Sequence, residues 1–346
     1  TARVTKMIDP AGVEVTLSYT LRGEVETEQR EGDGVVNYAY NLDGTMASVA
    51  DALGNTTTFT YDDAGRQTTR IDATGAVEVM EYNTAGELVA KIDRLGQRTD
   101  ITYDSNGRID TMADPSGRTT DHDYDTAGQL LARQFGDGTT ISYDYDDLGR
   151  RTQMVDPTGT TTYSYDANGR PIEVAAPNGT LGYTYDLAGR RTELTYPDGT
   201  TATYDYDAAG RLTGLTDPNT GDVDYTLDDD GRLVLTELPN GETRSFDFVN
   251  GQMVSHQDHG RVTNLTYNES GRIATLSGAE NHTYTYDQAG QLTQAVQDEG
   301  TYAYTYGTRG EITSISDPDR SRTFTHNANV EIDTIIDNNA NTGSAI

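Results

Sequence analysis

The sequence contains no cysteine and no tryptophan, and only five phenylalanines. Without cysteine the chain can form neither disulfide bonds nor thiolate metal sites. Hydrophobic residues make up 34% of its 346 residues, too few for the thick apolar core of a conventional domain of this length. No apolar run approaches the roughly 20 residues that a membrane-spanning helix needs. We therefore expect a chain with no membrane span and little hydrocarbon core.

Basic residues are scarce relative to acidic ones. The chain has 25 Lys and Arg against 56 Asp and Glu, for a net charge of −31. Nucleic-acid binding relies on a basic surface, so the charge argues against a nucleic-acid partner. Low hydrophobicity with high net charge is also typical of disorder. The 23 tyrosines and the many Thr and Val residues favour strands instead, so we predict ordered β-structure.

The strongest pattern in the chain is an internal repeat of 19 to 21 residues. An anchor residue, usually aromatic, precedes a turn signal in each copy, at Tyr19, Tyr40, Tyr61, Tyr82, Tyr103, Tyr124, Tyr145, Tyr165, Tyr185, Tyr206, Leu227, Phe248, Tyr267, Tyr286, Tyr306 and His326. Such periods are typical of arrays in which each copy packs on its neighbours. No change in composition divides the copies. We predict one array over residues 1–346, with about sixteen repeats and a degenerate last repeat at 326–346.

The chain begins with Thr1 and shows no signal-peptide pattern. This start predicts that the sequence is an excised part of a longer chain.

Each repeat carries two turn signals. The first is Asp-x-x-Gly, as in Asp62–Gly65, where Asp bonds forward to backbone amides and Gly accepts the left-handed conformation. This combination favours a type I turn with a glycine bulge between antiparallel strands. The second is Pro-x-Gly, as in Pro115–Gly117 and Pro177–Gly179, where proline presets the turn.

Alternating stretches of five to eight residues lie between the turns, as in Thr200–Asp207. Two strands per repeat predict an all-β fold, a long antiparallel meander of about thirty short strands. Sheets of this length twist and curl, so we expect a spiral tube or a hollow shell.

Six copies carry the full motif Tyr-Asp-x-x-Gly-Arg and define the structural residues of the repeat. These are Tyr61, Asp62, Gly65, Arg66, Tyr103, Asp104, Gly107, Arg108, Tyr145, Asp146, Gly149, Arg150, Tyr165, Asp166, Gly169, Arg170, Tyr185, Asp186, Gly189, Arg190, Tyr206, Asp207, Gly210 and Arg211. We expect the arginines to stack on tyrosine rings and to pair with the turn aspartate of the same or the next repeat. Tyrosines should line up in rows, where cross-strand pairs stabilise the sheet.

The motif resembles the YD repeat of the Rhs family, which includes bacterial polymorphic toxins, shell-forming subunits of insecticidal toxin complexes and the teneurins. The resemblance extends over nearly the whole chain. It implies a β-ribbon that spirals into a hollow shell and a secreted or cell-surface location. In bacterial members the shell encloses a toxin, and in teneurins the related barrel supports adhesion.

The chain departs from the toxin pattern near its end. Asp317-Pro318 is followed by Asp319-Arg320, without the Asp-Pro-x-Gly-Leu signature of family members that cleave themselves. The autoprotease role is therefore not carried over to any residue of this chain.

The sequence contains only poor matches to catalytic or metal-binding patterns. The carboxylates recur at turns and offer no distinct pair of the kind that hydrolyses glycosides. His256 and His259 could clamp a metal, but we expect them in a loop. Asp121–Asp125 and Asp228–Gly231 resemble fragments of calcium loops, although the first lacks the required Gly and Glu. We predict no catalytic residue, no metal site and no cofactor, with calcium between acidic turns as the alternative.

These observations favour a structural, non-enzymatic protein. The first hypothesis is the repeat wall of a secreted or surface protein that encloses a polypeptide cargo. A variant is self-association into a tube or filament through open end strands, because unpaired strands are templates for another chain. The alternative is an adhesion or carbohydrate-binding module that uses tyrosine-lined strands, and an enzyme is the third hypothesis.

Overall fold

The computed structural model describes residues 3–278 and 281–339. Its regular elements are 33 strands. Within each of the two compact units described below, strands that follow one another in the sequence pair antiparallel. The described residues form no helix, and accordingly none that is long and apolar enough to cross a membrane. The predicted all-β antiparallel meander is confirmed. Contacts divide the chain into two compact units.

Unit 1 comprises Thr1–Arg98, Asp247–His256 and Arg261–Ile346. Its N-terminal stretch holds β1 (Lys6–Ile8), β2 (Glu14–Tyr19), β3 (Val25–Arg30), β4 (Val35–Tyr40), β5 (Met46–Ala50), β6 (Thr56–Tyr61), β7 (Gln67–Ile71), β8 (Val77–Tyr82) and β9 (Leu88–Ile92). Its C-terminal stretch holds β26 (Arg261–Tyr267), β27 (Ile273–Gly278), β28 (His282–Tyr286), β29 (Leu292–Gln297), β30 (Gly300–Tyr306), β31 (Ile312–Ser316), β32 (Arg320–His326) and β33 (Ile332–Asn339).

Unit 2 comprises Thr99–Phe246 and Gln257–Gly260. It holds β10 (Arg98–Tyr103), β11 (Ile109–Ala113), β12 (Thr119–Tyr124), β13 (Leu130–Phe135), β14 (Thr140–Tyr145), β15 (Arg151–Asp156), β16 (Gly159–Tyr165), β17 (Pro171–Ala176), β18 (Gly179–Tyr185), β19 (Arg191–Thr195), β20 (Thr201–Tyr206), β21 (Leu212–Asp217), β22 (Gly221–Leu227) and β23 (Leu233–Glu237). Strands β24 (Thr243–Val249) and β25 (Gln252–Asp258) contribute residues to both units, and the first residue of β10, Arg98, belongs to unit 1.

The first turn has the predicted bulged hairpin geometry in every copy of the full motif. The turn after Phe248 differs, because the chain reverses there at Asn250 and Gly251, which both have positive φ. In the hairpin of β6 and β7, the Asp62 amide donates to the Arg66 carbonyl oxygen at 2.9 Å, and Gly65 has φ of 76°. The register shifts by one residue beside Tyr61, which pairs with Gln67. Thr68 is the extra residue on β7 at this shift, so the hairpin has a second bulge beyond the glycine bulge of the turn itself.

The second turn occurs in two forms. In the hairpin of β7 and β8, the Gly75 amide donates to the Asp72 carbonyl oxygen at 2.9 Å, and the loop has the same hydrogen bonds as the loop of a first turn. In the hairpin of β15 and β16, Asp156 pairs directly with Gly159 across a two-residue loop. Both forms join strands that are adjacent in sequence, so the turns alone set the order of the meander.

The interior of the sheet holds few buried apolar side chains. The buried hydrophobic residues are Val13, Ala90, Ala202, Leu265 and Ala295, and no large side chain among the described residues is fully buried. Burial of apolar surface scales with area, so side chains this small supply little of the stability. Strand ladders and contacts between successive turns must supply most of it.

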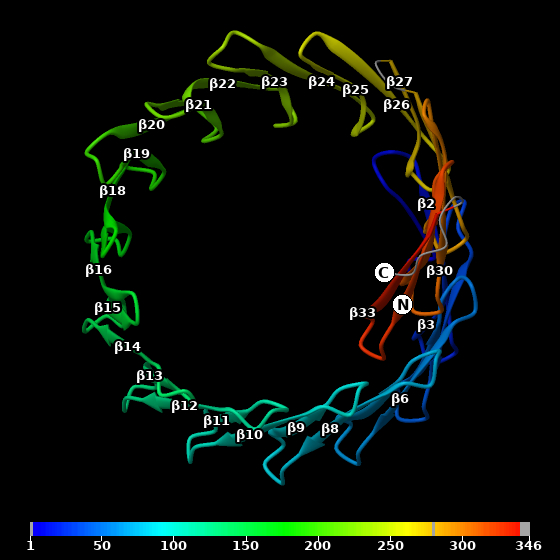
Figure 1. The fold of residues 1–346 in the computed structure, drawn as a ribbon, viewed down its shortest axis with the longest axis horizontal. Helices are drawn as coiled ribbons and strands as arrows, with labels where there is room; N and C mark the ends of the chain where they lie inside the picture. The colour runs from blue at the N-terminus through cyan, green and yellow to red at the C-terminus, as the bar shows by residue number, and fades with distance from the viewer. Residues whose placement is uncertain (1–2, 279–280, 340–346) are drawn as a thin grey trace. The chain divides into compact units, whose positions relative to one another are not determined.

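In unit 1 the N-terminal and C-terminal stretches pack against each other, and Figure 1 shows the blue strands of the first beside the orange strands of the second. The Gly34 amide donates to the Gln288 carbonyl oxygen at 2.9 Å across this contact. We call this contact the seam of unit 1; its polar residues are described below.

Candidate functional site

The aspartate at each first turn organises its own repeat. Oδ1 of Asp166 accepts the amides of Asn168 and Arg170, both at 2.9 Å, and Oδ2 accepts Nε of Arg170 at 2.7 Å. The bond from the Arg170 backbone amide is the largest influence on the pKa of Asp166 and lowers it; burial opposes this, and the bond from the Arg170 guanidinium helps to hold the pKa below its ordinary value. The turn therefore favours an ionised aspartate, because its hydrogen bonds go to the charged form.

The other full copies of the motif repeat this geometry. The Nε–Oδ2 distance is 2.6–2.7 Å in the pairs Asp62–Arg66, Asp104–Arg108, Asp146–Arg150, Asp186–Arg190 and Asp207–Arg211. The glycines of these copies, Gly65, Gly107, Gly149, Gly169, Gly189 and Gly210, all have positive φ. Glycine is needed at this position because the left-handed conformation is costly for residues with a Cβ.

Each of these arginines also reaches the following repeat. The guanidinium carbon of Arg170 lies 4.6 Å from the centre of the Tyr185 ring, and Nη1 donates to the Asp186 carbonyl oxygen at 3.2 Å. The Tyr185 hydroxyl donates back to the Pro171 carbonyl oxygen at 2.8 Å. We call this set, an arginine with its own turn aspartate and the tyrosine of the next repeat, a clasp.

Clasps join several successive repeats. The guanidinium carbon lies 4.6–4.8 Å from the ring centre in the pairs Arg66–Tyr82, Arg108–Tyr124, Arg150–Tyr165 and Arg190–Tyr206. Tyr61, Tyr103 and Tyr145 follow first turns that do not end in arginine, so these anchors receive no clasp arginine. Tyr145 still donates its hydroxyl to the Leu130 carbonyl oxygen at 2.9 Å.

The sequence motif did not reveal where the tyrosine hydroxyl bonds. The partner carbonyl belongs to the strand residue after the preceding turn, a position without a conserved side-chain type within this chain, as Pro171 and Leu130 show. A backbone acceptor leaves no signal in the sequence. A spacing of 13 to 15 residues between the tyrosine and the residue of the acceptor carbonyl is the regularity that could have indicated it.

A second contact between repeats involves the glycine of the second turn. A Cβ placed on Gly179 would lie 2.3 Å from Cβ of Pro197, and one on Gly159 would lie 2.6 Å from Cγ of Pro177. Proline in one repeat therefore packs on the bare backbone of glycine in the repeat before it. The Pro-x-Gly signal serves packing as well as turn geometry.

The seam of unit 1 contains a partly buried ion pair between segments far apart in sequence. Asp33 accepts hydrogen bonds from Nη1 and Nη2 of Arg272 at 2.5 and 2.7 Å and from the Ser270 hydroxyl at 2.8 Å. Burial raises the pKa of Asp33, but the bonds from Arg272 and Ser270 outweigh it and hold the pKa below its ordinary value. Arg30 adds a bond from Nε to the Ser270 carbonyl oxygen at 2.8 Å.

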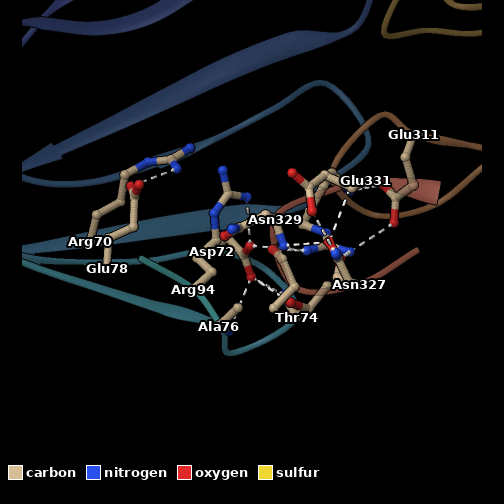
Figure 2. A network of polar contacts seen from close by, with 12 residues as sticks. Arg70, Asp72, Thr74, Ala76, Glu78, Arg94, Glu311, Asn327, Asn329 and Glu331 are labelled. Carbon is tan, nitrogen blue, oxygen red and sulfur yellow. Dashed lines mark hydrogen bonds and ion pairs between the residues drawn. The ribbon is translucent and has the colours of Figure 1, made fainter. Parts of the chain in front are cut away.

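A second polar network of the seam is centred on Asp72, whose side chain is 4% exposed (Figure 2). Asp72 accepts bonds from its own turn at Thr74 and Ala76 and from Nη1 of Arg94 at 3.3 Å. Nη1 of Arg309, from the C-terminal stretch, lies 3.9 Å from the same carboxylate. Asp93 accepts Nδ2 of Asn329 at 2.7 Å.

The last described turn keeps its shape without glycine. Val330 occupies the glycine position of the final repeat with φ of 70°, and its amide donates to the Asn327 carbonyl oxygen at 3.0 Å. The following strand, β33, pairs with β32 over its length. Repeat contacts thus hold a β-branched residue in a conformation that is costly for it.

The residues considered as metal ligands in the sequence do not form a metal site in the described part of the structure. His256 lies in strand β25, so its expected place in a loop is wrong, because the strand continues to Asp258 before the chain turns. His259 lies in the turn and contacts Glu242 and Asp258. Within residues 3–278 and 281–339, no three His, Asp or Glu side chains are grouped to hold a metal ion. Calcium binding stays a prediction.

Hairpins that repeat along the chain and hold one another by their turns define a β-repeat protein. The RHS Repeat family model matches residues 40–77, 165–201, 185–222 and 206–243. The Teneurin YD-shell model matches residues 75–181 and 245–341, more than half of the chain. The chain belongs to the teneurin YD-shell family, as the Tyr-Asp motif predicted.

Solved structures of Tc toxin components share the fold. The Tc holotoxin pore of Photorhabdus luminescens has a TM-score of 0.75 with 16% identity, covering 92% of this chain and 22% of its own. The TcdB2-TccC3 crystal structure has a TM-score of 0.74, also with 16% identity, covering 92% and 23%. This chain thus spans about a fifth of the length of these structures. No curated protein matches it.

Proposed function

We propose that the chain forms part of the wall of a secreted or cell-surface shell, and that it acts as a scaffold without catalysing a reaction. The clasps are the observation that carries this proposal. They place charged, hydrogen-bonded side chains between successive turns, where a wall needs resistance to unravelling. The Tc toxin structures, which have the same fold, support the assignment of a shell role.

The cargo that we propose for this wall is a polypeptide. A wall with few buried apolar side chains offers a polar surface, on which an unfolded segment can lie without strong hydrophobic capture. The family likeness supports this cargo only by analogy of fold. An enclosed segment would be shielded from proteases because bulky enzymes cannot reach it.

Protease protection tests the enclosing role. A polypeptide that cannot fold is appended after residue 346 and digested alongside the same polypeptide free in solution. We expect the attached segment to be cut more slowly, and Arg272→Gln, which breaks the pair with Asp33, to reduce the protection. Cleavage at the free rate in both attached forms would contradict enclosure.

Self-association is the variant of this function that the exposed side chains of β33 support. Ile332, Ile335 and Ile336 of β33 are 57%, 50% and 42% exposed. Exposed aliphatic side chains on one strand favour contact with another copy of the chain. Light scattering at rising protein concentration tests this, and a constant monomer mass at the highest concentration would exclude a filament.

The carbohydrate-binding alternative relies on free tyrosine faces. In the clasps, an arginine covers a face of rings such as Tyr185 and the hydroxyl is bonded to backbone. A cavity of about 390 Å³ beside Phe135, Asp114 and Arg118 in unit 2 is the better place for a sugar. Glycan-array binding that Phe135→Ala abolishes would favour this alternative, and a blank array would favour the wall.

A further inference from the structure

The seam of unit 1 follows one rule at several successive turns. Its N-terminal side consists of second turns, and its C-terminal side consists of first turns. An aspartate of a second turn lies beside the third residue of a first turn. Contacts of this kind pair Asp33 with Ser270, Asp72 with Arg309, and Asp93 with Asn329. The partners are 236 or 237 residues apart, so the two rows of turns stay in register along the seam.

The seam uses only one edge of each stretch. Successive hairpins of a meander turn at opposite ends of their strands, so first turns and second turns lie at opposite edges. The N-terminal stretch therefore has a further edge of first turns, which we call the head edge. The C-terminal stretch has a further edge of second turns, which we call the tail edge. The head edge comprises the turns at 20–23, 41–44, 62–65 and 83–86, and the tail edge comprises the turns at 297–300 and 317–320. These are the same two kinds of edge that meet at the seam.

Arg309 shows how a first turn contacts a second turn across the seam. Its Nη1 and Nη2 donate to the carbonyl oxygens of Ala328 and Asn327, in the next first turn of its own stretch. Nη2 also lies 3.5 Å from the carboxylate of Glu311. In this position the guanidinium lies 3.9 Å from Asp72, in a second turn of the other stretch. The side chain of Arg309 is consequently only 10% exposed.

Arg22 is the counterpart of Arg309 on the head edge, as the third residue of its turn. Its Nη1 and Nη2 donate to the carbonyl oxygens of Leu42 and Asn41 in the next first turn, and its Nε lies 3.4 Å from Glu24. In the described part of the chain, no carboxylate of a second turn lies within ion-pair distance of it, and its side chain is 46% exposed. The head edge thus holds an arginine in the geometry that contacts a second turn at the seam.

Two leucines add an apolar surface to the head edge. Leu21 and Leu42, the second residues of neighbouring turns, are fully exposed, at 104% and 97%. Gln288 has the same position in a first turn of the seam, and its carbonyl oxygen accepts the Gly34 amide of the other stretch at 2.9 Å. Fully exposed leucines on neighbouring turns are typical of a surface that contacts another protein.

The tail edge carries the charge that complements Arg22. Glu299 and Asp319 are exposed residues of its two turns. Guanidinium groups bind carboxylates well because their paired donors match the two oxygens. The tail edge therefore offers the head edge acidic second turns, as the N-terminal stretch does at the seam.

We propose that the head edge of one copy of this chain binds the tail edge of a second copy, with Arg22 beside the acidic turns and with Leu21 and Leu42 covered. The proposal rests on the self-association variant of the wall function and names the surfaces that meet. Because the two edges differ, each bound copy leaves one edge of each kind free, and the contact propagates head to tail. The exposed isoleucines of β33 are not required for it.

Sedimentation velocity of the full chain at rising concentration tests the proposal. About 0.15 M salt limits the repulsion between chains of net charge −31 to a range of about 8 Å, so short-range contacts decide the outcome. We expect the average mass to rise with concentration, and Arg22→Glu to weaken association at least about tenfold. A constant monomer mass would overturn the proposal. Association of Arg22→Glu equal to that of the unchanged chain would also overturn it, and would assign the contact to β33.

Lys91→Glu is the matched control for charge. It makes the same charge change within strand β9, away from both edges, at a side chain that is 54% exposed. We expect it to leave association unchanged. A loss equal to that of Arg22→Glu would show that net charge alone sets the association, and would overturn the proposal.

A mixing experiment identifies the two edges. Arg22→Glu makes the head edge repel the tail edge, and a variant with both Glu299→Lys and Asp319→Lys makes the tail edge repel the head edge. Neither variant should associate alone. In the mixture each altered edge meets a complementary edge of the other variant, so association should return to within about tenfold of the unchanged chain. A monomeric mixture, with native circular dichroism for both variants, would refute the pairing. The enclosing role is tested separately by protease protection and does not fail with this proposal.

Discussion

The guanidinium carbon of Arg108 lies 4.6 Å from the centre of the Tyr124 ring, one repeat further along the chain. The same side chain bonds its own turn aspartate, Asp104, through Nε at 2.7 Å and the carbonyl oxygen of Asp125 through Nη1 at 3.0 Å. One arginine thus ties its own turn to the next one. In a sheet with few buried apolar side chains, such ties carry much of the cooperativity between neighbouring repeats.

Removal of a clasp arginine should loosen two repeats. Arg170→Ala deletes the stack on Tyr185 and the bonds to Asp166 and Asp186. A partly exposed cation–π contact contributes about 0.5–1 kcal/mol. With the charged hydrogen bonds we expect the local free energy of opening to fall by about 1–2 kcal/mol. Hydrogen exchange of β17 and β19 measures this quantity directly.

Arg118→Ala is the control for this prediction. Arg118 makes the same i, i+4 pair with its turn aspartate, Asp114, but its side chain is 79% exposed and the structure shows no ring beneath it in the described part of the chain. Exposed ion pairs contribute about 0–1 kcal/mol. An equal loss in Arg118→Ala and Arg170→Ala would show that the ring contact contributes nothing.

The tyrosine hydroxyl should contribute separately from the ring. Tyr185→Phe keeps the stack with Arg170 and removes the bond to the Pro171 carbonyl oxygen. The expected loss is about 0.5–1.5 kcal/mol, the net value of a typical hydrogen bond. The change should appear as faster amide exchange on both sides of the clasp. Tyr163→Phe in the same unit is a suitable comparison, since that tyrosine is not a clasp anchor.

The two kinds of glycine should respond differently to alanine. At Gly179, with φ of 134°, a Cβ would lie 2.3 Å from Pro197, whereas at Gly199, with φ of 84°, it would meet nothing within 4 Å. Both substitutions incur the cost of positive φ, about 1–2 kcal/mol. Gly179→Ala should cost about 1–3 kcal/mol more, because the proline must move.

A double-mutant cycle with Pro197→Gly separates these costs. This change removes the atoms that a Cβ on Gly179 would strike, so the additional loss should disappear in the double variant. Chemical denaturation followed by circular dichroism gives the four stabilities. If the stability losses of the two single variants simply add in the double variant, the steric contact between Gly179 and Pro197 is not the cause of the additional loss.

Val330→Gly should stabilise the final hairpin. Val330 has φ of 70°, and a β-branched residue in this region is strained by about 1–2 kcal/mol relative to glycine. Part of this gain in stability is offset because the valine side chain, which lines a cavity of about 460 Å³ in unit 1, loses its packing contacts. We expect slower exchange of β32 and β33. Faster exchange would show that packing of the valine side chain stabilises the hairpin by more than the strained backbone of Val330 destabilises it.

Stability should fall in acid. The pKa values of Asp62, Asp104 and Asp166 are lowered in the folded state by bonds from Arg66, Arg108 and Arg170. A lowered folded-state pKa contributes stability that is present above the unfolded value of about 3.9 and is lost as the pH falls through the folded value. The urea midpoint should therefore be flat between about pH 5 and 8 and fall below about pH 4.

Asp166→Asn tests the origin of this pH dependence. Asparagine keeps an oxygen for the backbone amides of the turn but carries no charge for Arg170. The variant should be less stable at pH 7 and should lose less on acidification. A pH profile parallel to that of the unchanged protein would assign the acid transition to other carboxylates.

Much of the fold follows from the sequence because its causes are local. The Asp-x-x-Gly signal determines a hairpin from within five residues, as the bonds of Asp62 to Arg66 show, and period-2 alternation determines the strands between turns. The pairing of each arginine with its own turn aspartate is also local, at i and i+4. Repetition of these signals was sufficient to predict an antiparallel meander and the family of the chain.

Other features required the tertiary structure, because their partners are backbone atoms or distant residues. The tyrosine hydroxyl of Tyr185 bonds a carbonyl group, which has no signature in the sequence. Asp33 and Arg272 are separated by 239 residues and look like any other members of the repeat. Only the packing of the two stretches of unit 1 brings such pairs together, since a periodic chain contains many equivalent candidates and local physics cannot choose among them.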